Sequence, residues 1–199
     1  VMAGCAALSS QGDGYDVTGC SSTNAGDNCI VSCAPGYIGE STSFACASDN
    51  TDGTAEPSLT GSLATCTAIV ACSALVSPGP EYDVSDCSSV SASGTCAVGC
   101  ANGYHGVQTQ WSCSPNNVDS TAQPTGVLPS CVPITGCAAL SDIGAPFEVS
   151  DCASVPAGGE CDVSCAAGYT GTAAATYTCP SDNVDASTEP SGTLPTCNA

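Results

Sequence analysis

The spacing of the cysteines constrains this chain more than any other feature. Eighteen cysteines occur in 199 residues, at intervals of 15, 9, 4, 13 and 20 residues, then 15, 9, 4, 13 and 18, then 15, 9, 4, 14 and 18. An interval pattern that recurs in this way is the signature of a tandem repeat. The sequence therefore predicts three disulfide-rich modules, which we name module 1 (residues 1–66), module 2 (67–131) and module 3 (132–199).

A module of this size is near the limit at which one hydrophobic core can stabilise a fold. Six cysteines in each module favour disulfides, each worth about 2–4 kcal/mol. Zinc sites favour closely spaced cysteine pairs combined with histidines, so this pattern favours disulfides over zinc. Because disulfides persist in oxidising compartments, we expect a secreted protein that is extracellular or on the cell surface.

The apolar residues recur together with the cysteines. Short stretches of alternating apolar and polar residues next to cysteines indicate half-buried strands at residues 15–18, 29–33, 109–113 and 176–179. Side chains repeated in this way indicate the cores of small all-β modules, which leaves no aromatic face for binding a sugar. The aromatic columns are Tyr15, Tyr82 and Phe147; Tyr37, Tyr104 and Tyr169; and Phe44, Trp111 and Tyr177. Leucines recur as Leu8, Leu75 and Leu140 and as Leu63, Leu128 and Leu194, and valines as Val31, Val98 and Val163.

The charge excludes several classes of function. The chain has 19 acidic residues, no lysine and no arginine, for a formal net charge of −19. A nucleic-acid binder needs cations to meet phosphates, and docking on anionic membranes or heparin-type ligands needs them equally. No apolar run approaches the ~20 residues that a membrane-spanning helix requires, so we expect no membrane insertion.

At their third to sixth cysteines, the modules resemble complement-control (sushi) domains. The matching stretches are Cys33-Ala34-Pro35-Gly36-Tyr37, Cys100-Ala101-Asn102-Gly103-Tyr104 and Cys165-Ala166-Ala167-Gly168-Tyr169. The expected tryptophan between the last two framework cysteines is absent, Gly39, Gly106 and Gly171 follow the tyrosine early, and each module has an extra cysteine pair. The resemblance implies three sushi-like β modules with short linkers.

Six cysteines allow 15 connectivities, so the residues alone do not choose among them. The sushi resemblance makes Cys5, Cys33, Cys46 and Cys66 the four framework cysteines of module 1. It implies that the first of these pairs with the third and the second with the fourth, which leaves Cys20 and Cys29 to pair with each other. The implied disulfides are Cys5–Cys46, Cys20–Cys29, Cys33–Cys66, Cys72–Cys113, Cys87–Cys96, Cys100–Cys131, Cys137–Cys179, Cys152–Cys161 and Cys165–Cys197.

Residues that carry catalysis are scarce. His105 is the only histidine, and Ile38 and Thr170 take its place in modules 1 and 3. Without lysine or arginine, the usual groups for general-base, Schiff-base and oxyanion roles are missing. We therefore expect no enzyme, no catalytic residue and no cofactor, with His105 as an incidental surface residue.

The acidic turn before the last cysteine is the one candidate metal site. Its carboxylates are Asp49, Asp52 and Glu56 in module 1 and Asp182, Asp185 and Glu189 in module 3. Hard oxygen ligands of this kind suit calcium, although the turn does not match an EF-hand. The alternative is a hydrated turn whose Asp and Asn side chains bond to their own backbone.

Glycosylation is a second open question. The chain has no Asn-x-Ser/Thr sequon, whereas serine and threonine make up 48 residues. O-linked sugars on loops such as residues 88–93 and a plain polar surface are both compatible with this composition.

The linkers indicate how the modules are joined. Five residues separate adjacent modules, and they include Ile69, Val70 and Ile134. Short apolar linkers predict an elongated semi-rigid rod, and the segment before Cys5 matches them, as in a piece of a longer array. We expect a non-catalytic structural segment of an extracellular fibre, whose partners are further modules or copies of itself joined head to tail into a filament. The alternative is an adhesion or receptor-type array that recognises a protein or, through calcium, a polysaccharide.

Overall fold

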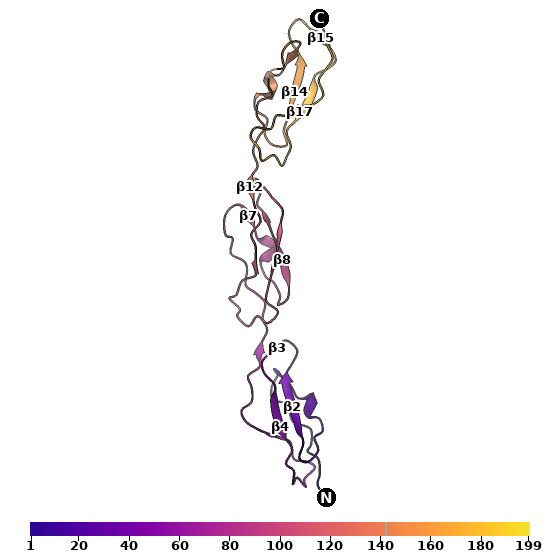
Figure 1. Ribbon diagram of the computed structural model, residues 1–199, viewed down its shortest axis with the longest axis vertical. Helices are drawn as coiled ribbons and strands as arrows, with labels where there is room; N and C mark the ends of the chain where they lie inside the picture. The colour runs from indigo at the N-terminus through magenta and orange to yellow at the C-terminus, as the bar shows by residue number, and fades with distance from the viewer. Residues whose placement is uncertain (142) are drawn as a thin grey trace. The chain divides into compact units, whose positions relative to one another are not determined.

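The computed structural model describes residues 1–141 and 143–199, and it confirms a small all-β, disulfide-rich fold (Figure 1). The same order of elements occurs three times. The first set is β1 (Tyr15–Asp16), η1 (Thr18–Cys20), β2 (Asn28–Cys33), β3 (Tyr37–Ile38), β4 (Thr42–Ala45), β5 (Ser58–Leu59) and β6 (Thr67–Ala68). The second is β7 (Tyr82–Asp83), η2 (Ser85–Cys87), β8 (Thr95–Cys100), β9 (Tyr104–His105), β10 (Thr109–Ser112), β11 (Thr125–Gly126) and β12 (Val132–Pro133). The third is β13 (Phe147–Glu148), η3 (Ser150–Ala153), β14 (Glu160–Cys165), β15 (Thr170–Gly171), β16 (Ala175–Thr178), β17 (Ser191–Gly192) and β18 (Cys197–Asn198).

Each set forms one four-stranded and one two-stranded antiparallel sheet. The four-stranded sheets have the orders β1-β2-β4-β5, β7-β8-β10-β11 and β13-β14-β16-β17. The two-stranded sheets are β3-β6, β9-β12 and β15-β18. In the first set Cys29 faces Phe44 across β2 and β4, and in the third Cys161 faces Tyr177 across β14 and β16. The register therefore places a cysteine opposite an aromatic residue in each.

By compactness the described chain divides into two units. Unit 1 comprises residues 1–74, 89–95 and 112–125, and unit 2 comprises residues 75–88, 96–111 and 126–199. Module 1 lies wholly within unit 1 and module 3 wholly within unit 2, whereas residues of module 2 contribute to both.

The core of module 1 lies on one face of its sheet. Val31 and Phe44 are 1% and 4% exposed, and they pack with Leu8 and with the Cys20–Cys29 disulfide. Along β2, buried and exposed residues alternate, as a strand with one solvated face requires. Leu63, Tyr15 and Val17 cover the edge of this cluster.

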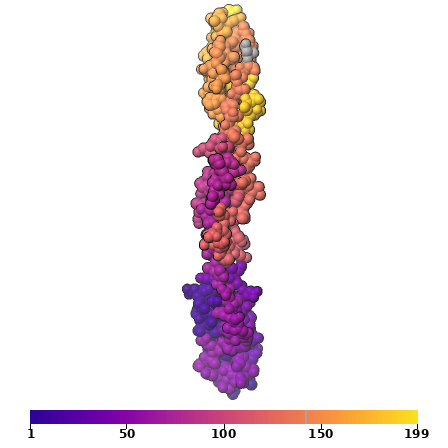
Figure 2. Space-filling view, turned by 90° about the vertical axis from the view of Figure 1, so that its left-hand side faces the viewer, coloured from indigo at the N-terminus to yellow at the C-terminus, as the bar shows by residue number. Residues whose placement is uncertain are grey.

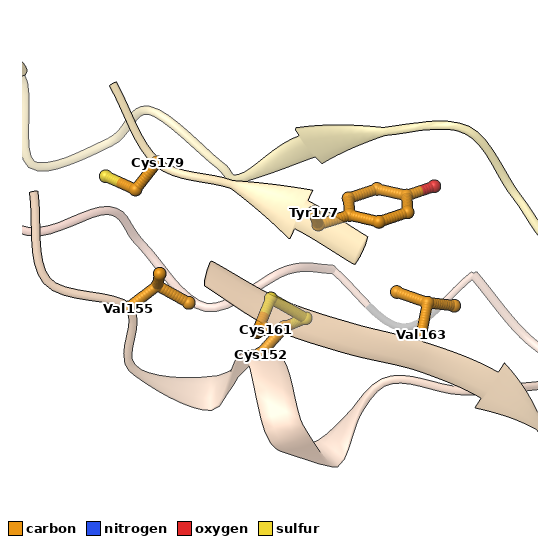
Figure 3. Close-up of a cluster of buried hydrophobic side chains, with 6 residues drawn as sticks. All are labelled: Cys152, Val155, Cys161, Val163, Tyr177 and Cys179. Atoms are coloured by element: carbon orange, nitrogen blue, oxygen red, sulfur yellow. A yellow bond between two sulfur atoms is a disulfide. The ribbon is translucent and has the colours of Figure 1, made fainter. Parts of the chain in front are cut away.

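Module 3 repeats this core with its own residues. Figure 3 shows Val155, Val163 and Tyr177 around the Cys152–Cys161 disulfide, and Cys179 beside them. Phe147, Leu140 and Val149 are partly buried against the cluster. The small number of large side chains is offset by sulfur, since free or bonded cysteine behaves as a compact apolar residue.

The predicted core columns hold for all nine aromatic residues, none of which is exposed. Trp111 is half-buried, and its indole Nε1 donates to the Val127 carbonyl at 3.1 Å. The prediction was wrong for two leucines of the last column. Leu128 and Leu194 are 38% and 45% exposed, because the loop before the last cysteine is two residues shorter than the one that carries Leu63 into the module 1 core.

The structure contains nine disulfides, and no described cysteine is free. They join the same nine pairs that the sushi resemblance implies: Cys5–Cys46, Cys20–Cys29, Cys33–Cys66, Cys72–Cys113, Cys87–Cys96, Cys100–Cys131, Cys137–Cys179, Cys152–Cys161 and Cys165–Cys197. Such a number of disulfides fits an extracellular protein.

Glycine is required at two repeated positions. Gly36, Gly103 and Gly168 have φ angles of 87°, 89° and 94°, in the left-handed region that favours glycine. Three residues after each, Gly39, Gly106 and Gly171 lie against the chain that precedes the last cysteine. A Cβ on Gly106 would stand 2.2 Å from the Ser130 carbonyl oxygen. The glycine three residues after each of these positions thus permits close packing of two backbone segments.

Candidate functional site: the linker and the asparagine turn

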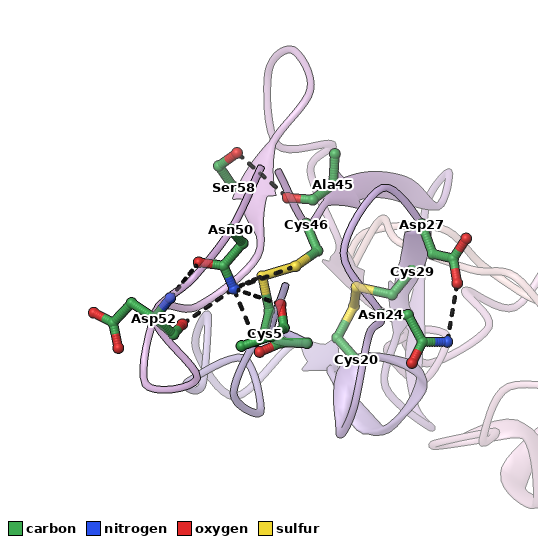
Figure 4. Close-up of a disulfide and its surroundings, with 12 residues drawn as sticks. Cys5, Cys20, Asn24, Asp27, Cys29, Ala45, Cys46, Asn50, Asp52 and Ser58 are labelled. Atoms are coloured by element: carbon green, nitrogen blue, oxygen red, sulfur yellow. Dashed lines mark hydrogen bonds between the residues drawn. A yellow bond between two sulfur atoms is a disulfide. The ribbon is translucent and has the colours of Figure 1, made fainter. Parts of the chain in front are cut away.

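An asparagine four residues after the fifth cysteine organises the acidic turn of module 1. The Asn50 side-chain Nδ2 donates to the carbonyl oxygens of Ala3 and Asp52, at 3.0 Å in both cases (Figure 4). Its Oδ1 accepts from the Asp52 backbone N–H, and its own carbonyl accepts from the Ala3 N–H. One side chain therefore joins the turn to the segment that enters the module.

The same arrangement occurs at both linkers. Asn117 Nδ2 donates to Val70 O at 3.1 Å, and the Val70 N–H donates to Asn117 O at 2.8 Å. Asn183 and Thr135 form the equivalent pair, at 3.2 Å and 2.8 Å. Asn117 and Asn183 are buried, so each of these hydrogen bonds is shielded from water. We call Asn50, Asn117 and Asn183 the asparagine clamp.

An aspartate two residues further on completes each turn. Asp52 Oδ1 accepts from the hydroxyl and from the N–H of Thr54, and Asp119 does the same with Thr121. The donated hydroxyl, and then the donated N–H, hold the pKa of each carboxyl below its ordinary value. Asp185 has a lowered pKa for the same reason, with Ser187 as the donor.

The first half of each linker bonds to the module before it. In unit 1, β6 pairs with β3, so that Thr67 faces Ile38, and the Ile69 N–H donates to Gly36 O at 2.8 Å. In unit 2, β12 pairs with β9, and the Ile134 N–H donates to Gly103 O at 2.8 Å. In module 3, β18 pairs with β15 in the same register.

The first four residues of each linker therefore take part in hydrogen-bonded pairing. Its first three residues bond to the preceding module, at β3 or β9 and the glycine just before that strand. Its fourth residue bonds to the asparagine clamp of the following module. No residue between Thr67 and Val70 is left as a free hinge, since each contributes to one of the two sets of bonds.

The calcium candidates are spread over the turn in local contacts. Glu56 Oε2 accepts from the Ser9 N–H and hydroxyl, at 3.1 Å and 2.9 Å, and Glu189 accepts from the Ser141 hydroxyl. Asp52 and Asp185 are engaged by their turn hydroxyls, while Asp49 and Asp182 are exposed. Among the described residues, no three His, Cys, Asp or Glu side chains gather closely enough to hold a metal ion. Calcium binding by this turn stays a prediction.

His105 lies in β9, is exposed, and faces Val132 of the linker strand. Two open hollows lie elsewhere in unit 2, one of about 180 Å³ lined by Asp83, Asp86 and Gln108, and one of about 440 Å³ lined by residues that include Phe147 and Glu148. Neither is lined by His105. On the face shown in Figure 2, the described residues of module 1, coloured indigo to violet, form a surface without a deep cleft.

Comparison with protein-family models gives no match for this chain, and comparison with curated proteins gives none either. No helix in the described part of the chain has the length and apolar character that crossing a membrane requires.

Sequence reasoning located the linkers but missed what the asparagine clamp does. The turn in which Asn side chains bond to their own backbone is present, since the Oδ1 of Asn50, Asn117 and Asn183 accepts from the N–H two residues further on. The burial of Asn117 and Asn183 and the bonds from all three to the segment before the module were not predicted. The signal was available in the spacing, since each stands four residues after the fifth cysteine while its neighbours vary.

Proposed function

We propose that this chain is a non-catalytic structural segment of an extracellular rod or fibre, built from sushi-like modules and joined head to tail to further modules or to copies of itself. The observation that carries the proposal is the linker, whose residues are hydrogen-bonded to the preceding module and then to the asparagine clamp of the next. A linker bonded in this way resists bending, which a fibre needs and a flexible tether does not.

Composition supports the same role. Nine disulfides stabilise modules that have few large apolar side chains. The absence of lysine and arginine removes every cleavage site for trypsin-like proteases, which suits an exposed and long-lived material. The carboxyl and hydroxyl groups keep its surface hydrated, and repulsion between like charges discourages lateral aggregation.

Hydrogen exchange tests the linker. We expect the amides of Val70 and Thr135 to exchange as slowly as those of β2 and β14. Asn117→Ala keeps the backbone carbonyl that accepts from the Val70 N–H, but it removes the side-chain bond to Val70 O and the two side-chain bonds to Asp119 that hold the turn. The Val70 amide should then exchange at least about tenfold faster, since each buried bond is worth about 1–2 kcal/mol. Asn116→Ala, at an exposed neighbour, is the matched control. Unprotected Val70 and Thr135 amides in the unsubstituted chain would remove the basis of the proposal.

Electron microscopy of material from the native source tests the assembly. We expect long, thin filaments with an axial repeat of one module or one chain. Isolated single chains at all concentrations would contradict head-to-tail assembly.

One observation favours a second candidate, an adhesion or receptor-type array. Module 2 exposes Val107 and Val127, at 82% and 77%, where modules 1 and 3 have Glu40 and Thr60, and Thr172 and Thr193. Exposed valines at two positions that are polar in the other modules suit recognition better than scaffolding. Beads coated with the chain, tested on arrays of cell-surface proteins and polysaccharides, should lose adhesion in the Val107→Thr/Val127→Thr variant if this candidate is right.

A further inference from the structure

The disulfides of each module define a short covalent route between its two linkers. In module 1 the chain enters at Cys5, which is bonded to Cys46, and leaves at Cys66, which is bonded to Cys33. Cys33 and Cys46 stand only 13 residues apart. Tension applied to the two ends of the module therefore passes through two disulfides and the segment 33–46, and it bypasses most of the chain.

The segment on this route runs through the centre of the sheet. It contains β4, which lies between β2 and β5 and carries the buried Phe44. Cys33 is the last residue of β2, and Cys46 directly follows β4, its antiparallel partner. The two strands are thus pulled from their carboxyl ends in opposite directions, so that the bonds between them are loaded together in shear rather than opened one after another.

Module 3 has the same route. Cys137 is bonded to Cys179, which directly follows β16, and Cys197 is bonded to Cys165, the last residue of β14. The third disulfide of each module is off the route: Cys20–Cys29 and Cys152–Cys161 close nine-residue loops inside the core. We propose that each module carries tension between its linkers through the two framework disulfides and one central strand, while the third disulfide serves packing alone.

The connectivity limits how far a module can be stretched. With its disulfides intact, module 1 extends from Cys5 to Cys66 by at most ~57 Å, given ~3.5 Å per residue and Cα–Cα distances of 5.8 Å and 5.5 Å across the two disulfides. After reduction the same ends separate by ~210 Å. For the whole chain the limits are ~240 Å and ~690 Å. This property belongs to a single chain and goes beyond any assembly into a filament.

Single-molecule stretching of the 199-residue chain, held at its two ends, tests the proposal. We expect the extended length to increase about threefold when a dithiol reductant converts the disulfides to thiols, being itself oxidised to a cyclic disulfide. Removing Cys20–Cys29 by Cys20→Ala/Cys29→Ala should leave the oxidised length unchanged. Removing both framework pairs of module 1, with Ala at Cys5, Cys46, Cys33 and Cys66, should lengthen it by ~130 Å.

These variants keep the test decisive even if one of them fails to fold, because the fully stretched length depends on covalent connectivity alone. An oxidised chain that stretches to ~690 Å, or one that lengthens on loss of Cys20–Cys29, would overturn the proposed route. A chain that behaves as expected but never forms filaments would keep this inference and refute head-to-tail assembly.

Pulling the β2–β4 pair from different attachment points tests whether its hydrogen bonds are loaded in shear. Handles attached at Asn28 and Ala45, which face each other at one end of the β2–β4 pair, load the bonds in sequence. We expect the pair to separate at a lower force in this geometry than when the chain is pulled from its ends. Equal forces in the two geometries would refute shear loading.

Discussion

At the scale of single residues, comparison between modules separates what the fold requires from what varies. Val90 and Val155 occupy one buried position, where module 1 has Thr23. These residues form the bridges to Cys72, Cys137 and Cys5. The Thr23 hydroxyl is buried without a hydrogen-bond partner among the described residues, so the module pays a desolvation cost there that its two siblings avoid.

Thr23→Val should therefore stabilise the protein. The two side chains have nearly the same shape, and removing an unsatisfied hydroxyl is worth about 1 kcal/mol. Chemical denaturation of the oxidised chain measures the effect. The reverse change in module 2, Val90→Thr, should cost about 1–3 kcal/mol. A destabilised Thr23→Val variant would mean that the hydroxyl has a partner in solution.

The turn aspartates make a second prediction at this scale. Because the folded-state pKa of Asp119 is lowered, its contribution to stability is complete above the unfolded pKa of about 3.9 and is lost as pH falls through the folded value. Asp119→Asn should thus lower the melting temperature near neutral pH, and the difference from the unsubstituted chain should shrink as pH falls below the unfolded pKa of about 3.9.

This titration is best followed in ~1 M salt, which screens the repulsion among the 19 acidic residues. Asp49→Asn is the control, since this carboxylate is exposed and lies outside the Asp52–Thr54 contact. A melting-temperature difference that is constant between neutral and acid pH would contradict the role given to Asp119.

At the scale of elements, the two-residue strands depend on close approach of the backbone. Gly106 directly follows β9, and its missing Cβ leaves room for the Ser130 carbonyl and the Cys100 sulfur. Gly106→Ala should cost about 1–3 kcal/mol or more, because the backbone cannot move without disturbing a disulfide.

Gly99 provides the matched control for this substitution. It lies in β8, and an added Cβ there would meet no heavy atom within 4 Å. Gly99→Ala should be neutral or stabilising by up to about 1 kcal/mol, since it restricts the unfolded chain. Thermal unfolding of both variants compares them, and equal losses would refute the close-approach argument.

The elements also show where sequence reasoning reaches its limit. The strands next to cysteines at residues 29–33, 109–113 and 176–179 were predictable, because alternation persists over several residues. The strand predicted at 15–18 was wrong beyond Asp16, since Thr18 begins the short helix η1, where the Asp16 carboxylate accepts from the Thr18 N–H. β3, β6, β9 and β12 have two residues each, too few for any period, and they exist because the framework disulfide and the glycine bring loop and linker together. The prediction that Leu128 and Leu194 are core residues was wrong for a related reason. Each lies three residues before the last cysteine, as Leu63 does, so this spacing does not reveal that their loop is two residues shorter.

At the scale of the whole molecule, stability rests on covalent bonds more than on the core. Chymotrypsin cleaves most readily after aromatic residues, and all nine are buried or half-buried in the described chain. We expect the oxidised protein to resist chymotrypsin, and reduction to raise the cleavage rate at least about tenfold, since each disulfide contributes about 2–4 kcal/mol. Trypsin is the internal control, because it has no site in either state. Rapid cleavage of the oxidised chain would contradict this picture.

The way each linker divides its hydrogen bonds has a practical consequence for recombinant work. Residues 67–69 complete the last sheet of the module before them, whereas Val70 belongs to the turn of the module after it. A fragment cut directly after Cys66 would lose the strand β6, and one begun at Cys72 would lose the bonds between Val70 and Asn117. The module boundary to use for cloning, swapping or duplication therefore lies between Ile69 and Val70, and between Ile134 and Thr135.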